Sequence, residues 1–303
     1  MDGILNIYKE KGFTSHDVVA VVRRTINQKK VGHTGTLDPD AEGVLPICVG
    51  KATKLADYIM NTGKTYEAEI TLGVETTTQD SSGEVTARQS VDFNEEKIEQ
   101  AVYSFKGDYM QIPPMYSAVK VNGKKLYELA RKGQEIERKA RKVEIRDISI
   151  IEFMPPDKIK ISVDCSKGTY IRTLAADIGI KLGCGAHMSH LVRTRSGKFD
   201  ISGSITLNTL KEISENGSLS TVLMPMKSAL VDYKKIYVVD KADKLMHNGG
   251  HIFDYYFDSK SDMISVGDIV AAFDSSLMLN GLYTAEIDED KKRLKIRPLT
   301  ILL

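Results

Sequence analysis

The order of strand-like and helix-like segments is the feature that most constrains the fold of this chain. Over residues 1–231 the two kinds of segment are mixed without a regular strand–helix–strand alternation. A doubly wound parallel sheet needs that alternation, because each parallel connection takes a long crossover that is usually a helix. We therefore expect an α+β fold with a mixed, mainly antiparallel sheet and flanking helices.

Several segments carry clear signals of their own. Lys64–Gly73 alternates apolar and polar residues, which predicts a half-buried strand. Ser15 is placed to cap a helix that carries valines at helical spacing. Further helices are expected over residues 94–105, 124–132, 170–182 and 206–216, and further strands over residues 4–8, 143–153 and 158–165.

The sequence pattern changes after about Val231. Short apolar runs then recur with Gly, Asn and Asp between them, which is typical of a small β-barrel or sandwich. A chain of 303 residues is also long enough for two domains. We expect one domain over residues 1–231 and a β-rich domain over residues 232–303.

Basic residues are concentrated in one part of the chain. Residues 120–146 carry ten Lys and Arg against four Asp and Glu, whereas residues 232–303 carry ten against twelve. A solvated surface is the ordinary interpretation of a charged run. The alternative is contact with the phosphates of a nucleic acid, which the aromatic rings of Tyr116 and Tyr127 would suit. The net charge of +1 favours neither interpretation.

The composition indicates a protein of the reducing cytoplasm. The sequence has no apolar run of about 18 residues and no basic and apolar leader, so neither a membrane span nor a secretory signal is expected. Cys48, Cys165 and Cys184 cannot make a disulfide framework. Cys184, His187 and His190 form a C-x2-H-x2-H pattern without a fourth ligand nearby, so no metal site is expected.

Common nucleotide-binding and hydrolase motifs are absent from the sequence. It contains no G-x-G-x-x-G after a strand, no G-x-x-x-x-G-K-[ST] and no G-x-S-x-G. Residues 31–50 contain four Gly and two Pro and cannot form one regular element. A long ordered loop of this kind is usually functional. Asp38 lies in this segment, five residues after His33.

The residues alone leave two interpretations of Asp38 open. Asp-Pro is a common start of a turn. Leu37 and Pro39 also restrict the backbone, which suits holding a carboxylate in one pose, and an ionised carboxylate acts as a nucleophile without activation. Asp40 and Glu42 are alternative carboxylates, but their closeness on one loop does not provide the separation that a glycosidase pair needs.

Two other residues are candidates for the same site. Arg172 lies at a predicted strand-to-helix join, and a buried arginine needs a carboxylate partner. An Asp38–Arg172 pair would keep Asp38 charged and oriented, while the alternative is a surface salt bridge. Tyr66 lies on the alternating strand, where plain core packing is the ordinary interpretation.

Four segments resemble the TruB-type family of bacterial tRNA pseudouridine-55 synthases. They are HTGTLDPDAEGVLPICVGKATK, KTYEAEITLG, IPPMYSAVKVNGKKLYELARKG and SKGTYIRTLAADIGIKLGCGAH. They occur in the family's order between residues 33 and 187. The resemblance implies the pseudouridine synthase fold, followed by a PUA-like RNA-binding domain over residues 232–303.

The resemblance also implies a reaction and its main residues. Such an enzyme isomerises uridine 55 in the T-loop of tRNA to pseudouridine after flipping the base out of its stack. Asp38 would be the catalytic nucleophile, and Arg172 would pair with it. Tyr66 would stack on the uracil and handle its C5 proton. The isomerisation needs no cofactor, and whether Asp38 attacks C1′ of the ribose or C6 of the base is left open.

Further positions are implied to bind the RNA. Tyr170 and Leu191 would line the uracil pocket, and His33 would fill the space that the base leaves in the RNA loop. The basic stretch over residues 115–142 would be an inserted thumb that clasps the T-arm. We expect its contacts to the RNA backbone from Lys124, Lys125, Arg131 and Lys132. Because the chain carries its own clamp, we expect a monomer that works without a guide RNA.

Two positions depart from the family pattern, and other functions stay open. Lys9-Glu10 stands where the family has Lys-Pro, and Glu42 stands where a small or hydroxyl residue is common; we expect Glu42 to face solvent. The residues also allow a non-catalytic RNA-binding module, a guide-dependent relative inside a ribonucleoprotein, and a base-excising glycosylase.

Overall fold

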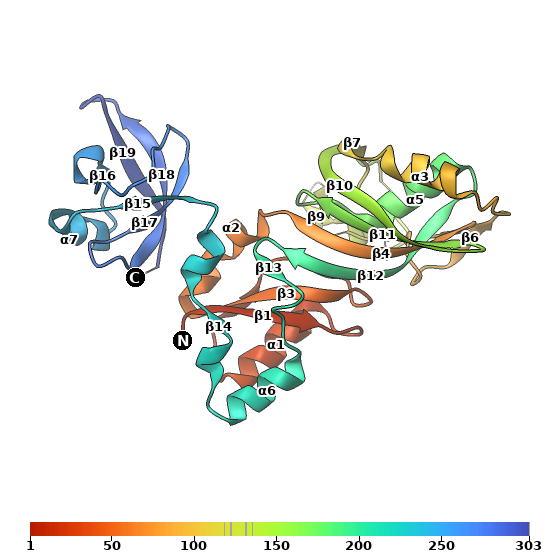
Figure 1. The fold of residues 1–303 in the computed structure, drawn as a ribbon, viewed down its shortest axis with the longest axis horizontal. Helices are drawn as coiled ribbons and strands as arrows, with labels where there is room; N and C mark the ends of the chain where they lie inside the picture. The colour runs from red at the N-terminus through yellow and green to blue at the C-terminus, as the bar shows by residue number, and fades with distance from the viewer. Residues whose placement is uncertain (118, 122, 131, 135, 303) are drawn as a thin grey trace.

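One large sheet runs through the first three quarters of the chain in the computed structural model, which describes residues 1–117, 119–121, 123–130, 132–134 and 136–302 (Figure 1). The strand order is β14 (Leu223–Met224), β1 (Gly3–Lys9), β3 (Glu42–Val49), β12 (Ala186–Ser196), β4 (Lys64–Leu72), β11 (Lys158–Cys165), β10 (Arg141–Met154) and β7 (Gly107–Gln111). Among the described residues, every neighbouring pair is antiparallel except β3 with β12. The expected mixed, mainly antiparallel sheet is confirmed.

Helices lie against both ends of this sheet. α1 (Ser15–Thr25) and α6 (Leu207–Glu215) lie side by side next to β1, while α3 (Glu95–Tyr103) and α5 (Ile171–Leu182) lie together near β10 and β12 (Figure 1). The cap of α1 is Thr14 rather than the expected Ser15, because Thr14 and Asp17 each bond the other's backbone N–H in a capping box. α5 ends as expected at Gly183, whose φ of +77° suits a residue without Cβ.

Residues 31–50 are more regular than the sequence indicated. β2 (Val31–His33) pairs with β3, so that the irregular part shrinks to residues 34–41. The apolar run of β3 explains the difference, because Val44, Leu45 and Ile47 are fully buried between neighbouring strands. Pro46 has no N–H to donate, and its carbonyl accepts from both the N–H and the hydroxyl of Thr34.

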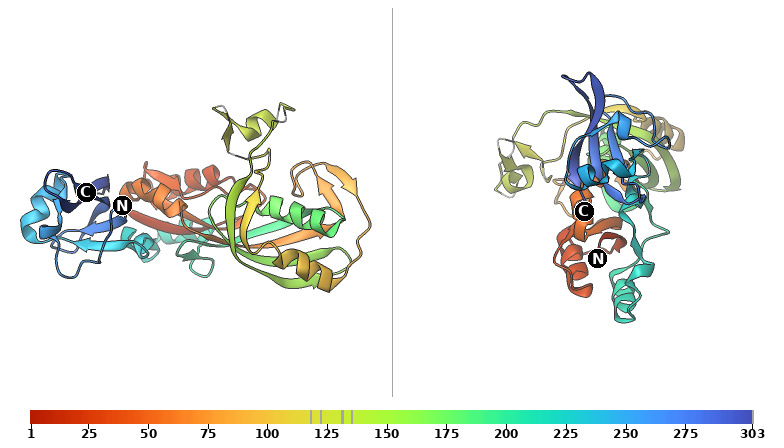
Figure 2. Two further views of the ribbon diagram at one scale, coloured as in Figure 1. Left: turned by 90° about the horizontal axis from the view of Figure 1, so that it is seen from above. Right: turned by 90° about the vertical axis from the view of Figure 1, so that its left-hand side faces the viewer.

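A basic insertion separates β7 from β10. It contains a two-stranded sheet of β8 (Lys120–Val121) and β9 (Lys124–Lys125), followed by α4 (Leu126–Ala130). These elements stand away from the large sheet (yellow-green in Figure 2). The helix expected over residues 124–132 is therefore shorter, because its first residues form a hairpin strand.

The last part of the chain forms a second sheet of its own. Its five strands have the order β15 (Lys234–Tyr237), β17 (Ile269–Phe273), β18 (Leu279–Asp288), β19 (Arg293–Ile301) and β16 (Ile252–Phe253), and α7 (Asp243–His247) lies beside it. The apolar runs expected after Val231 coincide with strands of this sheet, and one of them spans β16 and η5 (Asp254–Tyr256). A small C-terminal β-rich domain is confirmed, at one end of the molecule (Figure 1).

The two sheets share a hydrophobic cluster. Leu55 of η1 (Gly50–Leu55) and Ile59 of α2 (Ala56–Met60) pack in one cluster with Phe273, Leu282 and Leu302 of the second sheet region. The remaining short elements are β5 (Val74–Thr76), β6 (Val85–Arg88), β13 (Phe199–Asp200), η2 (Leu219–Thr221), η3 (Met226–Leu230) and η4 (Asp240–Ala242). Within the described residues, no helix combines the length and apolar character needed to cross a membrane.

Candidate active site

The loop that carries Asp38 is fixed to the start of α1. The Leu37 N–H donates to Ser15 Oγ at 2.9 Å, and the Leu37 side chain is buried. The Ala41 N–H donates to the Asp38 carbonyl at 3.1 Å, which closes a turn across Pro39 and Asp40. The Asp38 side chain is nevertheless 45% exposed. The turn that Asp-Pro predicted is therefore present, and this turn holds the Asp38 carboxylate where it stays accessible to solvent.

Arg172 joins two carboxylates. Its Nη2 pairs with Oδ2 of Asp38, and its Nη1 pairs with Oδ2 of Asp80 at 3.0 Å. The Arg172 side chain is only 9% exposed, so the pair with Asp38 is not an ordinary surface salt bridge. Among the described residues, Oδ1 of Asp38 forms no hydrogen bond or ion pair.

Asp80 was missed by the sequence analysis. It lies in an irregular segment between β5 and β6, and its Oδ1 accepts from the hydroxyls of Thr78 and Ser82. The preceding residue, Gln79, has a left-handed φ of +64° and accepts from the Thr173 hydroxyl on α5. A run of hydroxyl residues around one Asp was the only signal, and it also fits a plain Asx turn.

Lys9 ties the Asp38 loop to the end of β1. Its ammonium group is fully buried and donates to the carbonyls of Glu10, Phe13 and Pro39 at 3.1, 2.7 and 3.1 Å. Burial lowers the pKa of Lys9, while the negative charges of Glu42 and Asp38 act in the opposite direction. The substitution at Glu10 thus leaves the bracing by Lys9 in place.

Tyr66 lies on β4 directly opposite Arg193 of β12. Burial raises the pKa of the Tyr66 phenol, and the positive charge of Arg193 acts in the opposite direction. Leu191, which is 8% exposed, lies two residues before Arg193 and pairs with Ala68. Directly opposed residues share a face of the sheet, so these side chains line one surface beside the Asp38 loop.

Arg193 is a second residue that the sequence analysis missed. It is 1% exposed, and its guanidinium donates to the carbonyls of Val44, Gly35 and Thr36 at 2.7, 3.3 and 3.4 Å. It therefore joins β12 to the segment that leads to Asp38. The available signal was an arginine on the side of a strand that otherwise carries apolar residues. Arg195, two residues later, is expected on the same side and made that side look polar, which obscured the alternation.

His33 ends β2 close to this loop. Its Nδ1 accepts from the Gly35 N–H at 3.3 Å, and its ring meets the ring of His16 edge-on at 5.2 Å between centroids. Burial lowers the pKa of His33, and the positive charges of His16 and Arg193 lower it further. His33 is therefore neutral at pH 7.

The expectation that Glu42 faces solvent is wrong. Its side chain is 23% exposed, and its Oε2 lies 2.9 Å from Nε2 of His190. His187 is also engaged, since its Nδ1 lies 2.9 Å from the Val74 carbonyl. Each histidine of the C-x2-H-x2-H pattern therefore has a protein partner. Among the described residues, no group of three His, Cys, Asp or Glu side chains is arranged to hold a metal.

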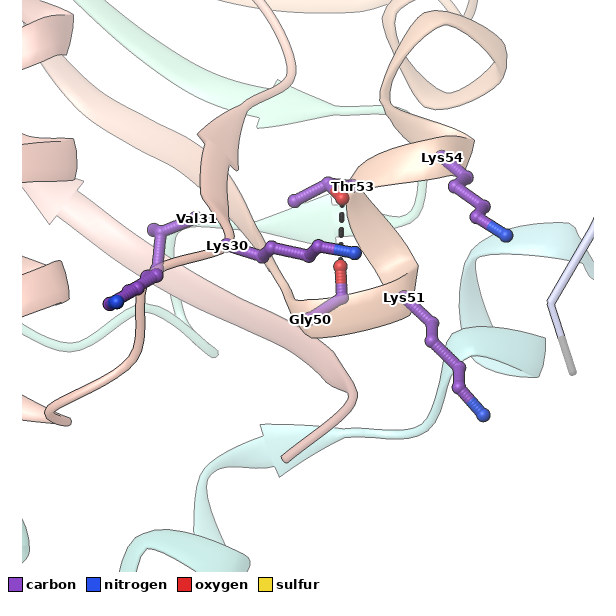
Figure 3. A pocket seen from close by; sticks show the side chains of 7 residues that line it. Lys30, Val31, Gly50, Lys51, Thr53 and Lys54 are labelled. Carbon is purple, nitrogen blue, oxygen red and sulfur yellow. Dashed lines mark hydrogen bonds between the residues drawn. The ribbon is translucent and has the colours of Figure 1, made fainter.

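The basic residues expected to bind RNA lie apart from this site. Lys124 and Lys125 form β9 in the insertion, Lys132 is exposed after α4, and Arg131 falls outside the described residues. A different lysine cluster surrounds a hollow of about 460 Å³ beside β2 and η1 (Figure 3). We call it the lysine pocket; its charged members are Lys29, Lys30, Lys51 and Lys54.

Comparisons with known proteins identify the family of this chain. Residues 23–171 match the family model of the TruB family pseudouridylate synthase N-terminal domain, and residues 172–231 match that of the tRNA pseudouridylate synthase B C-terminal domain. The chain is 52% identical over 256 residues to tRNA pseudouridine synthase B of Alkaliphilus oremlandii (strain OhILAs), covering 84% of each chain. It is 49% identical over 267 residues to that of Staphylococcus aureus (strain MSSA476), covering 86% of this chain and 88% of the relative.

Solved structures show the same fold along nearly the whole chain. In a Cbf5-Nop10-Gar1 complex, the similar chain has a TM-score of 0.78 and 29% identity, covering 99% of this chain and 85% of that one. In an H/ACA RNP bound to a substrate RNA containing 2′-deoxyuridine, the values are 0.77 and 27%, with the same coverage. The sequence-based family prediction is thus confirmed: this chain belongs to the TruB family of tRNA pseudouridine synthases and is a tRNA-modifying isomerase.

Proposed function

We propose that the enzyme isomerises uridine 55 in the T-loop of tRNA, with Asp38 as the nucleophile. The observation that carries this proposal is the buried guanidinium of Arg172, which holds one oxygen of Asp38 while the carboxylate stays accessible. An ion pair with a buried arginine fixes the direction of an aspartate side chain. Such a carboxylate is ready to attack without a base.

The reaction exchanges one bond to the ribose for another. The N1–C1′ bond breaks, a C5–C1′ bond forms, C5 loses a proton to solvent and N1 gains one, so composition and oxidation state are unchanged. The uracil must stay in its pocket while it turns. The shared face of Tyr66 on β4 and Leu191 on β12 supports this role, and we propose that Tyr170 at the start of α5 completes the pocket. Stacking on Tyr66 would return about 1–3 kcal/mol of the cost of flipping the base.

Release of tritium from tRNA labelled at C5 of uridine tests the nucleophile. Asp38→Asn should release no label while binding tRNA as the wild type does. Asp40→Asn is the matched control, because Asp40 lies two residues away on the same turn and is exposed. Normal turnover by Asp38→Asn would remove the proposal. Separation of the product nucleosides distinguishes pseudouridine from the free uracil of a glycosylase, and a tRNA with cytidine at position 55 tests the site.

The charged surfaces support RNA as the partner. The insertion over residues 112–140 stands away from the sheet as a clamp would, which fits the thumb expected over residues 115–142 (Figure 2). The lysine pocket lies at the other end of β3 from the Asp38 turn, about 23 Å along a strand of eight residues. Phosphates of a folded RNA arm that offers its base to Asp38 would fit both surfaces.

Charge reversal checks this RNA path. Reversing Lys124, Lys125, Arg131 and Lys132 should weaken tRNA affinity and flatten the dependence of log affinity on log salt by about 0.7–0.9 for each phosphate that the protein no longer neutralises. Lys30→Glu with Lys51→Glu tests the lysine pocket in the same way. Lys211→Glu is the control, because this exposed lysine of α6 lies outside both surfaces. An unchanged slope would move the RNA path elsewhere.

The remaining proposals concern the guide RNA, the C-terminal domain, the oligomeric state, the compartment and the cofactor. The clamp supports action without a guide RNA, which activity of the purified protein on a tRNA transcript alone would establish. We also propose that residues 232–303 are a PUA-like RNA-binding domain, that the enzyme is a monomer in the cytoplasm, and that it uses no cofactor. Sedimentation at micromolar concentration tests the monomer, and retained activity after dialysis against a chelator tests the last point.

A further inference from the structure

The residue that precedes helix α5, Tyr170, is held by a side chain from another part of the fold. Tyr170 is the N-cap residue, with an extended backbone (φ −101°, ψ 108°) and no side-chain cap of its own. The amide of Gln111 comes from across the fold and bonds the backbone of Tyr170 itself. Its Nε2 donates to the Tyr170 carbonyl at 2.9 Å, and its Oε1 accepts from the Tyr170 N–H at 2.8 Å. One side chain therefore bonds both backbone groups of one residue, and the Tyr170 carbonyl also accepts from the Leu174 N–H of α5 at 3.1 Å.

The anchor of this amide is rigid. Gln111 is the last residue of β7, where it pairs with Arg141 of β10, and it is 2% exposed. A buried amide with both ends bonded has one orientation, because turning it by 180° would set donor against donor and acceptor against acceptor. The position of Tyr170 is thus tied to the edge of the large sheet.

The start of α5 carries two groups of the active site. Tyr170 lies at the uracil pocket in the proposed function, and Arg172, two residues later, holds Asp38 and Asp80. Thr173 follows with its hydroxyl bond to Gln79. Since the guanidinium must reach both carboxylates, a small displacement of the first turn moves the Tyr170 ring and the Asp38 partner together.

We infer that Gln111 is a positioning residue for catalysis. Its amide fixes the main chain of Tyr170 and thereby sets the uracil pocket and the Arg172–Asp38 pair. This inference rests on the proposed roles of Tyr170 and Asp38. Gln111 itself touches neither carboxylate. It acts through the backbone at the N-terminus of α5.

The chemistry of the amide suggests a selective test. Gln111→Glu keeps the acceptor for the Tyr170 N–H, but an ionised carboxylate has no donor for the Tyr170 carbonyl and repels it. A protonated carboxyl regains the donor. Gln111→Leu has neither group at any pH. The charged and titratable groups around this position are Tyr109 on β7, Asp177 on α5 and Arg141 on β10.

The experiment measures kcat and KM for tritium release from C5-labelled tRNA between pH 5.5 and 8.5. At pH 8 both variants should lose about 100-fold in kcat, the usual effect of displacing catalytic groups by an ångström, with tRNA affinity nearly unchanged. As the pH falls, the Gln111→Glu variant should recover relative to wild type, while Gln111→Leu should not. Gln100→Glu is the matched control, because Gln100 is exposed on α3 and should follow the wild-type profile.

The outcomes separate the alternatives. Wild-type kcat in either Gln111 variant at pH 8 would overturn the inference, and so would equal losses in both variants at every pH. Should Gln111→Leu fail to fold, the pH-dependent recovery of Gln111→Glu decides alone, because its neutral form keeps both hydrogen bonds. Mapping of the product in the wild type is independent: modification at a position other than 55 would refute the proposed substrate site, while the comparison of the variants would still hold.

Discussion

Single buried cations hold the Asp38 loop in place. Lys9 gathers three carbonyls around the Asp38 turn, and Arg193 bonds three more on the segment before it. Within the described part of the chain, neither cation forms an ion pair with a carboxylate, so both act on the dipoles of the backbone. The position of Asp38, the proposed nucleophile, thus depends on residues that bond the backbone around it rather than its carboxylate.

Replacement of Arg193 is the direct test of this dependence. Arg193→Met should destabilise the fold by about 2–3 kcal/mol, because buried carbonyls lose their donors, and should reduce kcat as well. Arg195→Met is the control on the same strand: its side chain is 34% exposed, and its loss should cost under about 1 kcal/mol. Urea unfolding and tritium release measure the two effects. Equal stability of the two variants would contradict the bracing role of Arg193.

The neutral state of His33 should appear in the pH dependence of stability. Its pKa is lowered in the folded protein, so below the ordinary value of about 6.5 the unfolded chain binds more protons than the folded one. Stability therefore rises with pH through this window and is lost as the pH falls below it. Between pH 7.5 and 5.5 the wild type should lose more unfolding free energy than His33→Gln, whereas the exposed control His251→Gln should follow the wild type. Parallel losses in all three would refute the account.

At the scale of elements, sequence patterns correctly predicted those features that depend only on residues close together in the chain. The alternation of Lys64–Gly73 and the glycine after residue 182 match β4 and the end of α5, because periodicity and a left-handed cap act within a few residues. β12 escaped prediction, since its sequence turns an arginine inward at the active site. Asp80 and Gln111 escaped because their partners lie 92 and 59 residues away along the chain.

Two glycines of α5 and its C-terminal cap allow a test of what fixes this helix on the sheet. Gly183→Ala adds a Cβ that meets nothing within 4 Å, so only the strain of its φ of +77° remains, about 1 kcal/mol. A Cβ on Gly179 would overlap the Ala186 nitrogen of β12. Gly179→Ala should therefore cost about 2–3 kcal/mol, although alanine favours a helix. Denaturant unfolding measures which of the two variants loses more stability. A smaller loss for Gly179→Ala than for Gly183→Ala would mean that α5 does not pack closely on β12.

At the scale of the whole molecule, the two sheets are joined by apolar packing. Among the described residues, the shared cluster has thirteen buried members, nine from residues 1–231 and four from the C-terminal sheet region. Polar contacts follow the same junction, since Lys54 Nζ donates to the Ile301 carbonyl at 2.6 Å. Domains joined by small polar interfaces move independently, whereas large apolar interfaces couple them. The lysine pocket, of which Lys54 is a member, thus borders a firm junction.

This junction predicts that the chain unfolds as one cooperative unit. Calorimetry should give a single transition whose van't Hoff and calorimetric enthalpies agree. Phe273→Ala removes the largest C-terminal side chain of the shared cluster and should lower the free energy of unfolding by about 3–5 kcal/mol. It should also split this transition, because the large sheet loses less stability than the C-terminal sheet and the two then unfold separately. Ile296→Ala is the control: Ile296 belongs to the separate core of the C-terminal sheet, so it should lower the melting temperature without uncoupling the junction. Two transitions in the wild type would show that the shared cluster does not couple the sheets.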